Sequence, residues 1–252
     1  RDVYLRHAGI YVLEHIASSP SQIADLVKSN SPAIRLVAVV ALRRMKSDEL
    51  KRFINDSDPY IQDEVIRAID DLDIVDLKPL CAALLDKASA RKWTPLMLRR
   101  LVNHAYRDGS AENADRILNI ISDKETPEVV RREALRLLAL WEKPNPADPV
   151  SGKWRPLAPR ALDTLKPSLL KAIPKLLSAN EQALSGALDL SMTYKLGADS
   201  ISSDKLRDYR FNDKLLPGTR SKALAVYISR KEKDLLSVLQ KLAEDPMDEV
   251  AV

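Results

Sequence analysis

The chain has 252 residues, 45% of them hydrophobic and 30% charged, which is typical of a folded globular protein. Only 6 glycines and 2 phenylalanines occur, and no stretch alternates apolar and polar residues, which argues against a β-rich fold. The net charge of +4 does not by itself predict a nucleic-acid ligand, and no apolar run approaches the roughly 18 residues that suggest a membrane-spanning helix.

The charges are unevenly distributed along the chain. Residues 48–76 contain ten acidic and three basic residues, whereas residues 151–175 contain six basic residues and one acidic residue. Such polarity can steer a partner or dock a neighbouring domain, but solvated outer faces of helices are the favoured explanation.

A short phrase recurs along the chain and predicts a helical repeat protein. Most copies begin with Asp, Ser or Thr, often followed by Pro, which is typical of a helix N-terminus, and continue with aliphatic residues at helical spacing. The copies are DVYLRHAGIYVL from Asp2, SPAIRLVAVVAL from Ser31, DPYIQDEVIRAI from Asp58, TPLMLRRLVNHA from Thr94 and TPEVVRREALRLL from Thr126, with weaker ones from Asn180, Pro217 and Asp245. The chain opens inside a copy, without an initiator Met or signal peptide, so we expect a fragment of a larger protein.

One place in the phrase is filled by arginine or glutamine. The residues there are Arg6, Arg35, Gln62, Arg99, Arg131 and Arg220, and the first intervals are 29, 27, 37 and 32 residues. These intervals fit helix pairs with variable loops, near the shorter end of HEAT-like periods. We expect the aspartates at the turns to cap helices, and a carboxylate at the start of one unit to pair with the arginine of the next.

Companion helices are expected between the copies. They are predicted at residues 21–29, 48–54, 77–87, 111–122, 162–177, 203–209 and 233–243. The predicted fold class is therefore all-α, an α-α superhelix (a HEAT-like repeat solenoid) of about seven helix pairs. We expect a single solenoid over residues 1–252, with the first repeats in 1–142 and further repeats in 161–252.

Residues 143–160, KPNPADPVSGKWRPLAPR, interrupt the repeats with five prolines and are predicted to be a loop insertion. Long ordered loops often carry function, which makes Trp154 and Arg155 candidate partner-binding residues. The structural alternative is that Trp154 and Pro156 clamp the loop against the helices.

The stretch ALRLLALWEKPNPADPVSGKWRPL resembles a segment of a family of large exported proteins from planctomycetes and verrucomicrobia, which are described as membrane-bound dehydrogenases or heme-binding CxxCH proteins. The stretches YLRHAGIYVL, DPYIQDEVIRAIDDLDI and MLRRLVNHAYRDG are similar to the HEAT region of that family. The resemblance covers roughly residues 2–157. In that family the HEAT region follows a β-propeller that resembles sugar dehydrogenases and precedes a c-type cytochrome domain.

The resemblance implies a non-catalytic scaffold between a propeller dehydrogenase domain and a cytochrome domain, in an exported, periplasmic redox protein. This chain has no CxxCH, so no catalytic or heme-binding residue is transferred, and we expect neither enzyme activity nor a cofactor in the chain itself. Its partners are then protein domains, either neighbours in the same polypeptide or a redox partner. A cytoplasmic location stays open.

The residues that could carry chemistry are few. Cys81 lies in an apolar helical run and is predicted to be a buried, inert thiol. His7, His15 and His104 lack metal-ligand partners at suitable spacing, so structural roles are expected for them, with a distal heme ligand as a remote option for His104. We expect no catalytic and no metal-binding residues.

The alternative function is binding through a basic face of the solenoid. Arg99, Arg100 and Arg107 lie on one predicted helix, and Arg131 and Arg132 lie on the next basic one. If both helices line a concave wall, these arginines could bind nucleic acid or an acidic protein partner. Aromatic residues, at 5% of the chain, are not interleaved with the bases, which argues against nucleic acid.

Overall fold

The computed structural model describes residues 3–88, 93–232 and 234–243, and within them every regular element is a helix. In chain order these are α1 (Val3–Ile16), α2 (Pro20–Ala24), η1 (Asp25–Lys28), α3 (Pro32–Arg44), η2 (Asp48–Phe53), α4 (Pro59–Leu72), η3 (Val75–Leu77), α5 (Lys78–Ala82), η4 (Ala83–Lys87), α6 (Pro95–Asp108), α7 (Ala111–Ser122), α8 (Glu128–Ala139), η5 (Leu162–Thr164), α9 (Lys166–Ala179), α10 (Glu181–Thr193), α11 (Ser203–Arg210), α12 (Pro217–Ser229) and α13 (Leu235–Ala243), where η marks a 3₁₀ helix. The predicted all-α class is confirmed.

The chain divides into two compact units. The first contains Arg1–Asn113 and Asn145–Leu157, and the second contains Ala114–Pro144 and Ala158–Val252. Most of the proline-rich segment therefore belongs to the first unit, although α8 and α9, the helices on either side of it in the sequence, belong to the second. The prediction of one uninterrupted solenoid over residues 1–252 stays a prediction.

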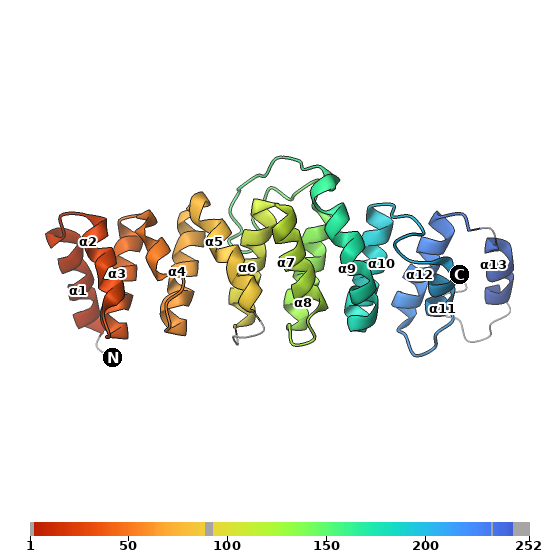
Figure 1. Ribbon diagram of the computed structural model, residues 1–252, viewed down its shortest axis with the longest axis horizontal. Helices are drawn as coiled ribbons and strands as arrows, with labels where there is room; N and C mark the ends of the chain where they lie inside the picture. Colours follow the sequence, from red (N-terminus) through yellow and green to blue (C-terminus); the bar gives the residue numbers. More distant parts are fainter. Residues whose placement is uncertain (1–2, 89–92, 233, 244–252) are drawn as a thin grey trace. The chain divides into compact units, whose positions relative to one another are not determined.

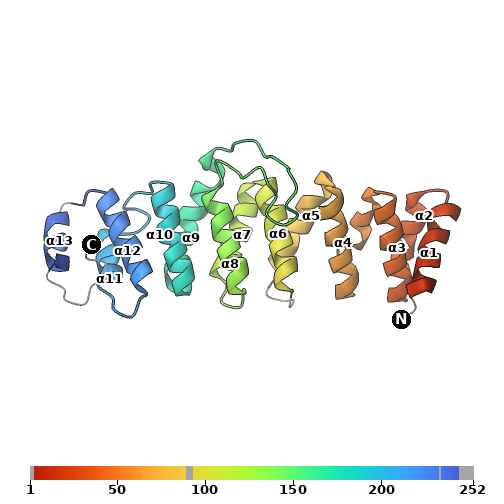
Figure 2. The same cartoon turned by 180° about the vertical axis from the view of Figure 1, so that it is seen from behind.

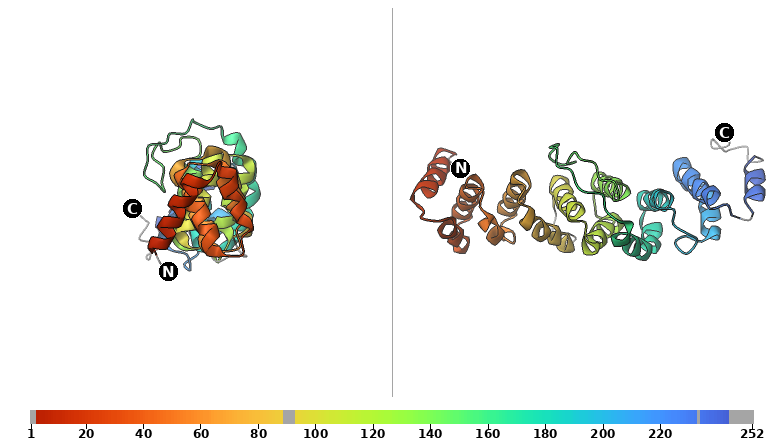
Figure 3. Two further views of the ribbon diagram at one scale, coloured as in Figure 1. Left: turned by 90° about the vertical axis from the view of Figure 1, so that its left-hand side faces the viewer. Right: turned by 90° about the horizontal axis from the view of Figure 1, so that it is seen from above.

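In the first unit, consecutive helices stack on one another. The phrase helices contact their neighbours in the order α1, α3, α4 and α6, as Figures 1 and 2 show. The companion segments cover them: α2 and η1 pack on α3, η2 packs on α3 and α4, and α5 packs on α6. Fully buried aliphatic side chains such as Val39, Ile66 and Leu101 form the core between these helices. This nearest-neighbour packing is what a helical solenoid requires, and Figure 3 shows the same order from red to yellow.

The second unit stacks in the same way, with α8 on α10, α9 on α10, α10 on α12 and α11 on α12. Trp141 is its largest fully buried side chain, and its indole N–H donates to the Thr164 hydroxyl at 3.1 Å. The Arg160 guanidinium lies 4.1 Å from the centroid of the Trp141 ring. The copy of the phrase that begins at Thr126 is therefore followed by a tryptophan that packs in the core of this unit.

Among the described residues the companion segments lie close to their predicted positions, but several differ in type; residue 233, where the last was predicted to begin, lies outside the described residues. The segment predicted at 111–122 is the α-helix α7, whereas 48–54 forms the 3₁₀ helix η2, and 77–87 divides into η3, α5 and η4. Pro79 lies in the first turn of α5 and lacks an N–H, so the turn before it cannot continue as one α-helix. Residues 143–160 contain no helix, as predicted; an isolated bridge joins Ala147 and Trp154.

The aspartates at the turns cap helices and pair with arginines, as predicted, but Asp56 pairs with an arginine that precedes it in the chain. Asp58 caps α4 by accepting the backbone N–H groups of Tyr60 and Ile61. Asp56 forms two hydrogen bonds with Arg35, at 2.8 and 3.0 Å, and both side chains are buried. Arg35 belongs to the preceding phrase, so this carboxylate pairs backwards along the chain rather than with the arginine of the next unit.

Several phrase helices end on a residue other than glycine with a left-handed backbone. Lys46, Asp73, Lys195 and Lys231 have φ between 49° and 57°. After Lys195, the N–H of Leu196 donates back to the carbonyl of Ser191 at 2.9 Å, which closes the helix end in a Schellman motif. A side chain in this conformation costs about 1 to 2 kcal/mol relative to glycine.

Replacing Lys195 with glycine should therefore raise the free energy of unfolding by about 0.5 to 1 kcal/mol, since the relieved strain exceeds the added chain entropy of glycine. Urea unfolding followed by circular dichroism measures the change. The matched control is Lys171→Gly, an exposed lysine within α9, which should lower stability by about 1 kcal/mol. A loss of stability in both variants would contradict the explanation.

Candidate functional site: the clamped loop 145–157

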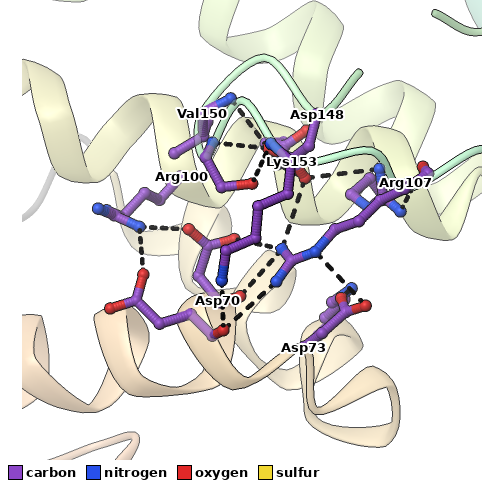
Figure 4. A network of polar contacts seen from close by, with 12 residues as sticks. Asp70, Asp73, Arg100, Arg107, Asp148, Val150 and Lys153 are labelled. Carbon is purple, nitrogen blue, oxygen red and sulfur yellow. Dashed lines mark hydrogen bonds and ion pairs between the residues drawn. The ribbon is translucent and has the colours of Figure 1, made fainter. Parts of the chain in front are cut away.

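Asp148 fastens the loop 145–157 to α6 (Figure 4). Its carboxylate accepts the backbone N–H groups of Val150 and Ser151, both at 2.9 Å. It also accepts the side-chain amide of Asn103 at 3.2 and 3.3 Å, and the Arg107 guanidinium lies 3.5 Å away. The Asp148 side chain is completely buried. The turn of the loop and two side chains of α6 thus converge on one carboxylate.

The hydrogen bonds decide the charge of this group. Burial by itself raises the pKa of Asp148, but the bonds from the Ser151 N–H, the Asn103 amide and the Val150 N–H, together with the charge of Arg107, hold the pKa below its ordinary value. Asp148 is therefore an anion in the folded protein at neutral pH.

Two basic residues of the loop bind the end of α4. The Arg155 guanidinium donates to the carbonyl of Asp70 at 3.0 Å and to that of Asp71 at 3.4 Å. The Lys153 ammonium donates to the Asp71 carbonyl at 3.1 Å. The last carbonyls of a helix lack partners within it and carry partial negative charge, so cations at this position are favourable. The loop therefore caps α4, while Arg107 donates to the Arg155 carbonyl at 3.1 Å.

A second layer of carboxylates lies under the loop. Asp70 is 1% exposed and pairs with Arg100, and Asp73 pairs with Lys78 and lies 3.6 Å from Arg155. Burial raises the pKa of Asp70, and the opposing charge of Arg100 offsets this only in part. For Asp73 burial is the largest influence and acts to raise the pKa, but the hydrogen bond and charge of Lys78, together with the charges of Arg155 and Arg107, outweigh it, so that pKa is lowered. The network is thus built from alternating opposite charges, which suits a clamp.

Next to Asn103 in the sequence is a buried histidine. His104 has no exposed surface, and neither of its ring nitrogens has a hydrogen-bond partner among the described residues. Burial, strengthened by the charges of Lys78, Arg100 and Arg107, lowers its pKa to about 3. The imidazole is therefore neutral in the folded state, and it does not face a neighbouring domain as the heme-ligand option required. Cys81 is fully buried, as predicted.

Trp154 lies between the two residues that cap α4, yet its side chain is 74% exposed. Pro156 is exposed as well. The expectation that Trp154 and Pro156 clamp the loop is therefore wrong: Asp148 and Arg155 do this through buried polar contacts. The result is a loop with a fixed backbone that presents a large aromatic side chain to solvent.

The structure brings together three of the arginines singled out as partner-binding candidates, Arg100, Arg107 and Arg155. Each contacts a carboxylate of the network. Arg131, in the second unit, is buried and donates to Gln182 at 3.0 Å and to the Thr126 carbonyl at 2.7 Å.

The remaining two arginine candidates differ in exposure. Arg99 is half-buried on α6, and Arg132 is exposed beside Glu128. A phosphate would have to displace the partners that Arg100, Arg107, Arg131 and Arg155 already have. The arrangement therefore gives the nucleic-acid alternative no specific support, and that alternative stays a prediction.

Sequence reasoning missed Asp148 and Asn103, which hold the loop, whereas Asp70 was expected to cap a helix or pair with an arginine, and it pairs with Arg100. A local signal existed for Asp148, because an aspartate followed by proline and, four residues on, by Gly152 is typical of a tight turn. Gly152 has a φ of 69°, and its N–H donates to the Asp148 carbonyl at 2.8 Å. Nothing local indicated that this turn would bury its carboxylate against α6.

No protein-family model, curated protein or solved structure matches the chain. Within residues 3–88, 93–232 and 234–243, no three His, Cys, Asp or Glu side chains are grouped so that they could hold a metal ion. None of the helices in these ranges combines the length and apolar character needed to cross a bilayer.

Proposed function

We propose that this chain is a HEAT-like interaction scaffold of about seven helix pairs, and that the loop 145–157 presents Trp154 to a protein partner. The observation that carries the proposal is the contrast within the loop: Asp148 is completely buried and held by three hydrogen-bond donors and the Arg107 guanidinium, while Trp154 is 74% exposed. Tryptophan is enriched at the energetically dominant positions of protein interfaces.

The backbone of the loop 145–157 is held in place, which favours binding through Trp154. A flexible loop loses conformational entropy when it binds, whereas a loop that is already fixed does not. The buried contacts of Asp148 and Arg155 fix the backbone on both sides of Trp154, which leaves mainly the two side-chain torsions of the indole to be ordered. Such an arrangement favours binding to a protein surface over chemistry at the loop itself.

The wider context follows from the resemblance. We propose that the scaffold links a propeller dehydrogenase domain and a c-type cytochrome domain within one exported, periplasmic redox protein, and that the contact made by Trp154 is with one of these neighbours. The gene on either side of this segment tests the context, because it should encode a β-propeller upstream and a CxxCH downstream. Absence of both would remove this assignment.

The contact itself is tested by placing a photo-crosslinking phenylalanine analogue at position 154 of the full-length protein. We expect crosslinked peptides to map to the propeller or the cytochrome domain. The same analogue at Lys205, an exposed position of α11, is the control and should give none. Replacing Trp154 with alanine should change the free energy of unfolding by no more than about 0.5 kcal/mol, because the side chain is mostly exposed. Crosslinks confined to residues of this chain would contradict the proposal.

A further inference from the structure

A recurring hydrogen bond joins four of the phrase helices, α3, α4, α8 and α12, to the companion helix that precedes each of them. The donor is the side chain at the arginine or glutamine position, and the acceptor is the backbone carbonyl at the end of the preceding companion helix. The pairs are Arg35 with Ser29 (2.8 Å), Gln62 with Ile54, Arg131 with Asp123 (3.2 Å) and Arg220 with Arg210 (3.1 Å). Ser29 follows η1, Ile54 follows η2, Asp123 follows α7, and Arg210 is the last residue of α11.

The physical reason is the same at each junction. The last carbonyls of a helix have no partner within that helix, and the helix dipole gives them partial negative charge. A guanidinium or amide group on the next helix satisfies them, and in doing so fixes where the companion helix ends against the phrase helix. The side chain at this position therefore recognises the C-terminal end of a helix.

In α1 the residue at this position is Arg6, which is exposed and forms no hydrogen bond or ion pair within the described residues. On the same helix lies an apolar stripe whose middle position the equivalent helices bury. Val12 is 46% exposed, whereas Ala41 and Ala68 at the same place in α3 and α4 are completely buried. Ile16, one turn further on the same face, is 71% exposed.

The face of α1 toward Val12 and Ile16 thus lacks the cover that α2 and η1 give to α3 and that η2 gives to α4. The basic side chain of Arg6 is exposed on α1, whereas the acidic Glu14 lies 3.4 Å from Arg44. A basic rim beside an apolar stripe complements the negative C-terminal end of an amphipathic helix.

We propose that this face of α1 docks the C-terminal end of an amphipathic helix from a further helix pair of the same stacking type. Arg6 donates to the last free carbonyls of that helix, and Val12 and Ile16 contact its apolar side. This proposal depends on the hydrogen bond that recurs between companion and phrase helices, and it is independent of the function proposed for Trp154.

The chain supplies its own probe for this face. Residues 18–30, which contain α2 and η1, precede Ser31 in the sequence, and Ser31 corresponds to Asp2 in the repeat. A copy of residues 18–30 placed directly before Asp2 puts the same companion segment in register with α1. We expect this extension to raise the thermal midpoint by about 3 to 6 °C and to slow amide exchange of α1 at least tenfold, whereas a scrambled copy changes neither.

The variants Arg6→Ala and Ile16→Glu identify the contacts. In the unextended chain both should leave the midpoint within about 1 °C, because these side chains are exposed. In the extended chain each should remove at least half of the gain. An extension that alters neither the midpoint nor the exchange of α1, or a gain that both variants leave intact, overturns the proposal. If light scattering instead shows that the unextended chain is a dimer and that Ile16→Glu is a monomer, a second copy of the chain binds this face. The proposal would then be overturned.

Discussion

Replacing Asp148 with alanine should release the loop 145–157 and lower the free energy of unfolding of the first unit by about 3 kcal/mol, the cost of breaking a buried ion pair by removing one partner. The variant leaves the Asn103 amide without its acceptor and the Arg107 guanidinium without its nearest carboxylate. It also removes the acceptor of two backbone N–H groups in the turn. Urea unfolding gives the change in stability, and the rate of tryptic cleavage after Lys153 reports release of the loop.

Two further variants separate the charge of Asp148 from its role in the turn. Asp148→Asn keeps an oxygen that can accept the Val150 and Ser151 N–H groups but loses the charge that faces Arg107, so its loss of stability should be roughly half as large. Asp163→Ala removes an exposed aspartate close to the loop in the sequence and should change stability by less than about 0.5 kcal/mol. Equal behaviour of Asp148→Ala and Asp163→Ala would show that the loop is not held through its buried carboxylate.

The arrangement of helices could be predicted from the sequence because its causes are local. Apolar residues at helical spacing, with Asp, Ser or Thr followed by Pro at the start, define α3, α4 and α6 without reference to the rest of the chain. The same signals placed α7 at residues 111–122. Where prediction failed in detail, as in the 3₁₀ helix η2, the segment is short, and its packing against α3 and α4 rather than its own propensity sets the backbone.

The site could not be predicted in the same way because its contacts join distant parts of the sequence. Asp148 meets Asn103 across 45 residues, and Arg155 meets the Asp70 carbonyl across 85. No periodicity encodes such pairs. Two of the three tryptophans illustrate the limit: Trp141 and Trp154 are close in sequence, yet one is fully buried and the other is 74% exposed. Whether a tryptophan is buried, as Trp141 is, or exposed, as Trp154 is, depends on the tertiary structure around it.

His104 should make the first unit sensitive to acid, and replacing it with leucine should remove this sensitivity. The ordinary pKa of 6.5 applies in the unfolded chain, whereas burial lowers the pKa of the folded state to about 3. Between these values the unfolded chain binds a proton that the folded protein does not, so stability falls as the pH falls below about 6.5 and continues to fall toward pH 3.

Each pH unit in this window corresponds to about 1.4 kcal/mol, so from pH 7 to pH 4 the wild type should lose roughly 3 kcal/mol more than His104→Leu. At pH 7 the variant should be at least as stable as the wild type, because it no longer buries two ring nitrogens without partners. Urea unfolding at pH 7, 5.5 and 4 measures both effects, with His7→Gln, at an exposed position of α1, as the control that should follow the wild type. If the loss of stability between pH 7 and pH 4 is the same in His104→Leu and the wild type, the folded state accepts a proton on this ring, and the buried layer beneath the loop must then open or admit water at acidic pH.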